Sequence, residues 1–217
     1  MTLAASILPS FDHAFRNRLA TLIAWRRDVR RFSDRAVPAA MIEELLDLAQ
    51  LAPSVGNSQP WRWIRVESQG KRAEIKENFR TCNAHALDMQ AGGQAEAYAA
   101  LKLEGMDRAP LQFAVFCDRE TTQGHGLGQR TMPETQDYST VAMITTFWLA
   151  ARAAGLGVGW VSILDPELVT ETLMVPASWK FVAYLCVGWP EEEHLDPELE
   201  RFGWQARGDA GRHVKII

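Results

Sequence analysis

The sequence predicts a single α+β domain with three layers, in which helices flank a central sheet. Three observations favour this class. Helical and strand patterns follow one another in mixed order, a few strands are apolar throughout and therefore buried, and helix exceeds strand. The 217 residues show no linker and no internal repeat, so we expect one domain over 1–217.

The first part of the chain predicts two helices and a strand. Over 12–25, apolar residues recur at helical spacing, and a basic segment follows. Over 38–52, a proline near the first turn, early acids and regularly spaced apolar residues predict a second helix. The turn-rich loop PSVGNSQPW, 53–61, then leads into RWIRVE, 62–67, whose alternation and Val and Ile content predict a strand.

The middle of the chain alternates between polar and apolar elements. Polar helical stretches are expected over 71–90 and 92–110, with a break at a pair of glycines. LQFAVFC, 111–117, is a continuously apolar strand. After the glycine-rich loop GHGLGQRTMPE, 124–134, the segment 140–156 is apolar nearly all round, which predicts a central buried helix.

The last part predicts two strands, VGWVSILD at 158–165 and KFVAYLCVGWP at 180–190. The segment 191–217 carries little core of its own. Such a tail often wraps a neighbouring element or a partner subunit, and we expect this here.

Composition narrows the function classes. The formal net charge of −4 and the isoelectric point near 5.8 argue against general nucleic-acid binding. The three cysteines have no paired spacing, so neither a disulfide framework nor a metal site is predicted. No apolar run reaches the roughly 18 residues of a membrane span, and the pattern of a signal peptide is missing. We therefore expect a cytoplasmic protein.

Anion recognition must be local, and the stretch RRDVRRF at 26–32 is the first candidate for it. One acid, Asp28, stands among four arginines: Arg26, Arg27, Arg30 and Arg31. Planar guanidinium groups bind phosphate through charge-assisted, often bidentate hydrogen bonds. A solvated basic end of the preceding helix would produce the same pattern.

The loop at 53–61 is the second candidate, through Ser54, Asn57 and Gln59. Small polar side chains beside a glycine bring donors and backbone close to a polyhydroxyl or heteroaromatic ligand. The same residue types also form ordinary turns, which is the alternative interpretation.

The third candidate is GLGVGWVSILDP at 155–166, where glycines precede a strand that carries Ser162. Such glycines could lie under a flat ring, or they could end a helix and allow tight packing. A dinucleotide-binding fingerprint is excluded, because these glycines follow a helix and enter a strand, the reverse of the required order.

In this order, RRDVRRF, APSVGNSQPW, GLGVGWVSIL and a C-terminal basic segment resemble the flavin-binding nitroreductase family over nearly the whole chain. The resemblance implies a mainly antiparallel sheet flanked by helices. It also implies a homodimer with FMN at the subunit interface and a C-terminal tail, about 191–217, exchanged between subunits.

The resemblance further implies the ligands of the flavin. Those expected for its phosphate are Arg26, Arg27, Arg30 and Arg207, with Arg212 or Lys215 as alternatives to the last. The ribityl chain and ring would be bound by Ser54, Asn57 and Gln59. Gly159 would lie beside the isoalloxazine.

Asp28 departs from the usual nitroreductase pattern, in which serine is common at this position. With GHGLGQRTMPETQDYS, YAALKLEGMDRAP and VGWVSILDPE, it resembles the narrower subfamily of 5,6-dimethylbenzimidazole synthases. These enzymes use dioxygen to cut reduced FMN, forming the lower ligand of cobalamin and erythrose 4-phosphate. Reduced FMN would thus be a substrate, supplied by a separate flavin reductase.

Two residues are expected to be catalytic in this subfamily. Asp28 would act as a general acid and base, and Ser162 would hydrogen-bond the flavin near nitrogen 5. Neighbouring arginines lower the pKa of an aspartate, whereas burial raises it, so the sequence alone leaves the direction for Asp28 open. The stretch about 83–106 would form a lid that excludes nicotinamide cofactors.

Two other functions fit the same motifs. A conventional NAD(P)H-dependent nitroreductase or quinone reductase would hold FMN as a cofactor in an open site. A flavin-binding protein without turnover would bind FMN and leave its reduced form unreactive.

Overall fold

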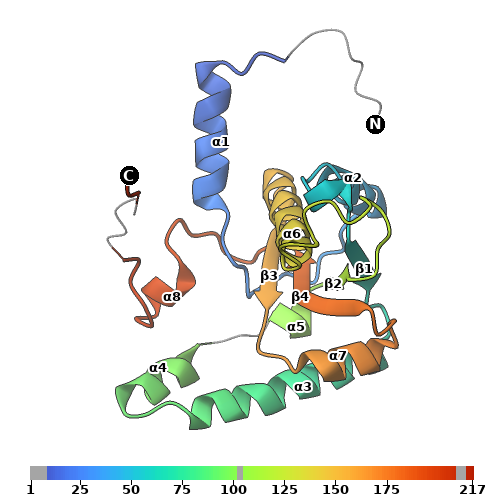
Figure 1. The fold of residues 1–217 in the computed structure, drawn as a ribbon. Helices are drawn as coiled ribbons and strands as arrows, with labels where there is room; N and C mark the ends of the chain where they lie inside the picture. Colours follow the sequence, from blue (N-terminus) through green and yellow to red (C-terminus); the bar gives the residue numbers. More distant parts are fainter. Residues whose placement is uncertain (1–8, 102–104, 209–213) are drawn as a thin grey trace.

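A computed structural model describes residues 9–101, 105–208 and 214–217. The described parts form three layers around one sheet (Figure 1). Its strands are β1 Trp61–Arg65, β2 Leu111–Asp118, β3 Gly157–Val161 and β4 Trp179–Gly188, and they lie in the order β1-β2-β4-β3. All three neighbouring pairs are antiparallel, which confirms the expected fold class.

Helices cover both faces of the sheet. On one face lie α2 Ala39–Ala49 and α6 Thr135–Ala153, which pack against each other. On the other face lie α3 Gln69–Asp88 and α7 Pro166–Leu173, also in mutual contact (Figure 1). The sheet is therefore buried on both sides, which explains why β2 is buried from Leu111 to Cys117 and is mostly apolar.

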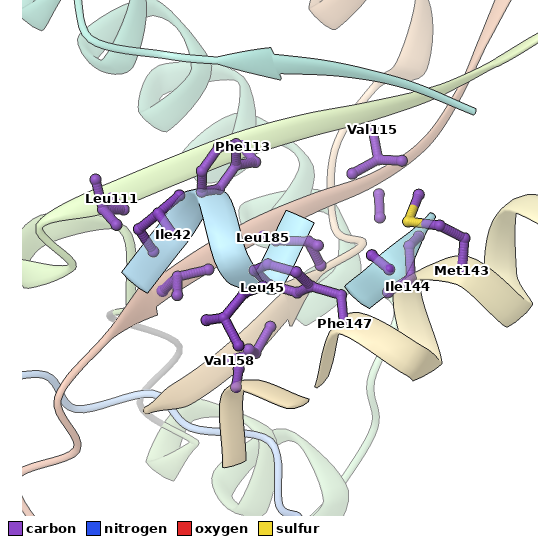
Figure 2. Packing of buried hydrophobic residues seen from close by; sticks show 14 of the residues in the cluster. Ile42, Leu45, Leu111, Phe113, Val115, Met143, Ile144, Phe147, Val158 and Leu185 are labelled. Carbon is purple, nitrogen blue, oxygen red and sulfur yellow. The ribbon is translucent and has the colours of Figure 1, made fainter. Parts of the chain in front are cut away.

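Successive side chains of the central strands point to opposite faces of the sheet, as the two-residue period of a strand requires, and each face has its own hydrophobic core. Phe113 and Val115 of β2 join the core under α2 and α6, with Leu185 of β4 (Figure 2). Ala114 and Phe116, between them, join the core under α3 and α7. The core of the first face contains most of the buried α6 side chains, which confirms the expected central helix.

Helix α1, His13–Trp25, projects away from the layers (Figure 1). Asp12 caps its start by accepting a hydrogen bond of 2.7 Å from the N–H of Phe15. The helix lies where the sequence predicts it, but none of its residues is buried. Its apolar face is exposed at Phe15, Leu19 and Ile23, and Phe11, which precedes the helix, is exposed as well.

Three elements differ from the sequence prediction. Helix α6 begins at Thr135, and the expected strand at 158–165 ends at Val161, so Ser162 follows β3 instead of lying within it. Helix α7 was not expected. Its signals are present in the sequence, because Asp165 caps its start and Pro166 occupies its first turn.

The expected lid and tail fold as short helices. The lid region contains the end of α3, then α4 Gly93–Ala100 and α5 Gly105–Arg108, and its residues 102–104 lie outside the described parts. The tail contains α8 Glu198–Arg201. Its backbone joins the body where Glu191 donates to the carbonyl of Arg31 at 3.1 Å. Exchange of the tail with a partner stays a prediction.

Candidate active site

The basic segment after α1 lies along the free edge of β3. The N–H of Val29 donates to the carbonyl oxygen of Val158 at 3.1 Å, and Asp28 forms a parallel bridge with Val158. This approach requires glycine at position 159, since a Cβ there would lie 2.2 Å from the carbonyl oxygen of Val29. Gly159 thus serves tight packing, the second of the two roles that the sequence allows.

The carboxylate of Asp28 turns back toward this strand. One oxygen accepts a hydrogen bond from the backbone N–H of Trp160 at 2.8 Å, and the other accepts from Nε of Arg30 at 3.1 Å. Burial raises the pKa of Asp28 and outweighs these two donors and the charge of Arg26, all of which lower it. Folding therefore sets the direction of the pKa shift of Asp28, which the sequence alone leaves open.

A cavity of about 100 Å³ lies beside Asp28. Arg30, Gly159 and Ser162 line it, together with apolar side chains that include Phe79 of α3. Cys186 of β4 also lines it, and burial raises the pKa of its thiol. The two expected catalytic residues, Asp28 and Ser162, are thus brought to one cavity, although more than 130 positions separate them in the sequence.

The arginines occupy different environments. Arg30 is mostly buried, and its Nη1 has no hydrogen-bond partner among the described residues. Arg26 stacks over the ring of Trp148, with 4.8 Å between the guanidinium carbon and the ring centre. The pKa of Arg27 is lowered, first by burial and then by the charges of Arg207 and Arg26. The charges of Arg26 and Arg207 thus both act on Arg27, and the acid Asp196 acts on it in the opposite sense.

Arg31 is directed to the tail instead. It pairs with Glu192 and, at 3.8 Å, with Glu198, and it lies over the ring of Phe202. A second cavity, of about 40 Å³, lies between these tail acids and the basic segment. Of the two alternatives to Arg207, Lys215 is exposed and Arg212 lies outside the described residues.

The second candidate group forms a tight turn before β1. The N–H of Gln59 donates to Oγ of Ser54 at 3.1 Å, and Gln123 donates to the carbonyl oxygen of Asn57 at 2.8 Å. Asn57 and Gln59 both have positive φ, 55° and 43°, a conformation that non-glycine residues rarely adopt. Strain of this kind is often found where residues serve a ligand.

Within one chain, this turn lies far from Asp28. The turn precedes Trp61 on edge strand β1, whereas Asp28 lies beyond β3 at the opposite edge, four strand spacings or about 19 Å across the sheet. Trp61 pairs with Cys117, and Val158 is level with Leu111, so the two places also differ by six residues, or about 20 Å, along the strands. One chain does not bring the two candidate groups together.

Sequence reasoning missed several residues of this region. Phe79 and Trp160 line the cavity, and Trp148 both stacks with Arg26 and donates to the carbonyl oxygen of Arg27 at 3.3 Å. The sequence of α3 does not single out Phe79, because the helix is polar overall and has no clear apolar face.

No helix in the described parts has the length and apolarity needed to span a bilayer.

Comparison with known proteins identifies the family. A model described as the nitroreductase family matches residues 23–189. The chain is 60% identical to a 5,6-dimethylbenzimidazole synthase of Rhodospirillum rubrum, over 92% of this chain and 94% of that protein. It is 50% identical to one of Rhodobacter capsulatus, over 90% and 95%.

The fold agrees with these matches. The crystal structure of an iodotyrosine deiodinase with FMN and 3-iodo-L-tyrosine has a TM-score of 0.72 and 21% identity, with coverage of 91% of this chain and 100% of that one. The chain belongs to the nitroreductase family. Within it, the resemblance to the 5,6-dimethylbenzimidazole synthases that the sequence motifs indicated is confirmed.

Proposed function

We propose that this protein is an oxidoreductase that uses dioxygen to cleave reduced FMN, forming 5,6-dimethylbenzimidazole and erythrose 4-phosphate. The observation that carries the proposal is the placement of Asp28 and Ser162 on one cavity, in a chain 60% identical to a protein named for this product. A conventional nitroreductase is supported only by distant relatives, such as a Bacillus subtilis protein at 24% identity.

The basic cluster suits the flavin phosphate. Arg26 and Arg207 both repel Arg27, and a bound anion would relieve the part of the pKa lowering of Arg27 that these two charges cause. Arg30 offers a buried Nη1 that has no hydrogen-bond partner within the described parts of the chain. A phosphate accepts several such hydrogen bonds, and the donor set therefore fits FMN.

A second copy of the chain would complete the site. The cavity of about 100 Å³ beside Asp28 is smaller than the roughly 300–1,000 Å³ of typical small-molecule pockets. The turn with Ser54, Asn57 and Gln59 is remote within one chain, and we propose that it reaches the flavin bound to the partner subunit. The exposed apolar face of α1 offers the contact surface that a homodimer requires.

Asp28 would move protons in the reaction. Four of the five ribityl carbons leave in erythrose 4-phosphate, so the remaining carbon, a CH2 group that becomes C2 of the benzimidazole, must lose one of its two hydrogens and its bond to the tetrose. A carboxyl group whose pKa is raised by burial holds and releases a proton closer to neutral pH than an exposed one. Its hydrogen bond from Trp160 fixes the direction of this carboxylate.

Ser162 and the surrounding apolar residues would control access to the ring. Ser162 lines the same cavity, and its hydroxyl makes no hydrogen bond to the described residues, so it is available to donate or accept. Phe79 and Ile163 keep the cavity partly apolar, which limits water. The lid region at about 83–106 would complete this exclusion and keep nicotinamide cofactors out.

Reduced FMN would come from a separate flavin reductase in the same compartment. The three cysteines are free, which suits a reducing cytoplasm. In this arrangement the protein consumes the flavin instead of reusing it.

The proposal is tested by mixing the purified protein with chemically reduced FMN in air, without NADPH. Formation of dimethylbenzimidazole, measured by mass spectrometry, with permanent loss of flavin absorbance is the expected result. Full recovery of oxidised FMN would overturn the proposal. Consumption of added NADPH would then identify a nitroreductase, and its absence a flavin-binding protein.

A further inference from the structure

Asn78 of α3 is one of the few buried polar side chains, with 8% of its surface exposed. Its amide forms two reciprocal hydrogen bonds with the backbone of Asp165. Nδ2 donates to the carbonyl oxygen at 3.0 Å, and Oδ1 accepts from the N–H at 2.8 Å. One side chain thus satisfies both backbone groups of a residue 87 positions away.

This pair of bonds anchors the connection that carries Ser162. Between the end of β3 and the start of α7, Ser162, Ile163 and Leu164 make no backbone–backbone hydrogen bond among the described residues. The connection is held at its far end by Asp165, which is bound by Asn78 and caps α7, and by the buried side chain of Leu164. Ser162 itself is exposed to the cavity.

The next residue on the same helix, Phe79, lines the cavity that Ser162 lines. Helix α3 therefore supplies one wall of the cavity and, one position earlier, the anchor of the loop opposite. A shift of the 162–165 connection relative to α3 would change the distance from Ser162 to any ligand held in that cavity. Asn78 opposes such a shift, because its two bonds are lost together.

We propose that Asn78 is a positioning residue, which acts through Asp165 to hold Ser162 at its place beside the flavin. The inference rests on the proposed function. It assigns Asn78 no contact with substrate. A displacement of about 1 Å in a reacting group can lower a rate about 100-fold, so a single anchor of this kind has a measurable effect.

The first test needs no flavin. Hydrogen–deuterium exchange of Asn78→Ala is compared with that of wild type and of Arg80→Ala, a matched control with an exposed side chain on the same helix. Exchange should rise at least about tenfold at the N–H of Asp165, which loses its acceptor, and stay unchanged in the control. Unchanged exchange at Asp165 in Asn78→Ala would overturn the inference.

The second test is a double-mutant cycle on dimethylbenzimidazole formation. Asn78→Ala should lower the rate about 10- to 100-fold in the wild-type background and less than about twofold in the Ser162→Ala background, because its effect passes through Ser162. The Kd for oxidised FMN should change little. If Asn78→Ala lowers the rate by the same factor in both backgrounds, Asn78 has a general structural role and the inference is overturned.

Asn78→Asp provides a variant of nearly unchanged volume. It keeps the acceptor for the N–H of Asp165 but places a carboxylate oxygen against the carbonyl oxygen of Asp165. It should remain folded by circular dichroism and still lose most of the rate, whereas wild-type kinetics would count against the anchor. If wild type itself forms no product, the proposed function fails, and the exchange experiment alone decides whether Asn78 holds the Ser162 connection.

Discussion

The carboxylate of Asp28 accepts a hydrogen bond of 2.8 Å from the backbone N–H of Trp160, across 132 positions of sequence. This bond ties the basic segment to the free edge of β3 and points the acid toward the cavity that Ser162 lines. Burial of the same carboxylate raises its pKa.

Replacing Asp28 by asparagine should separate binding from reaction. The amide keeps an oxygen for the N–H of Trp160, so the segment should stay in place and FMN should bind with nearly wild-type affinity. Formation of dimethylbenzimidazole should fall at least about 100-fold, because a general acid and base is lost. Product is measured by mass spectrometry and binding by flavin fluorescence. An unaltered product yield would remove Asp28 from the mechanism.

The raised pKa of Asp28 also predicts how stability depends on pH. The folded protein holds this proton more tightly than the unfolded chain, so the contribution of Asp28 to stability is lost as pH rises from about 3.9 through the raised folded value. Asp28→Asn removes this dependence. The Tm of the variant minus that of wild type should therefore be higher at pH 7 than at pH 4, and a constant difference would contradict the raised pKa.

Ser162→Ala should alter the fate of reduced flavin. Loss of the only hydroxyl that β3 and its following turn direct into the cavity should change the rate of reaction with oxygen about tenfold or change its products. Stopped-flow absorbance follows the flavin, and chromatography identifies the products. Wild-type kinetics together with wild-type products would exclude Ser162 from the reaction.

Mixed dimers test whether two chains share each site. Chains with Asp28→Asn and chains with Asn57→Ala should both be inactive alone. If the site combines Asp28 of one chain with Asn57 of the other, half of the dimers formed by random mixing contain one intact site out of two, which restores about a quarter of wild-type activity. Activity no higher than that of the separate variants would place both residues in the same chain's site.

The exposed face of α1 should lie in the subunit contact. The double substitution Leu19→Glu and Ile23→Glu should shift the protein toward monomer and lower FMN affinity at least about tenfold. Dimer formation would bury the two introduced charges without a partner. Thr21→Glu adds charge on the opposite side of the same helix and serves as the control. Light scattering gives the mass. If the doubly substituted protein stays dimeric, the subunit contact lies elsewhere than on α1.

The sequence alone determined the fold class, most helices and strands, and the family. These features follow from local patterns: the helical spacing over 12–25, the apolar run of β2 and the order of three motifs are all visible without a structure. It also singled out Asp28 and Ser162. It missed helix α7, although Asp165 and Pro166 carry the signals for its start.

Only the tertiary structure decided how the candidate residues relate to one another. The pKa of Asp28 depends on the balance between burial and nearby charges, and that balance exists only after folding. The role of Gly159 follows from the backbone of Val29 lying against it, and that of Asn78 from a contact with a distant loop. The separation of Asn57 from Asp28 follows from strand order, which local periodicity does not encode.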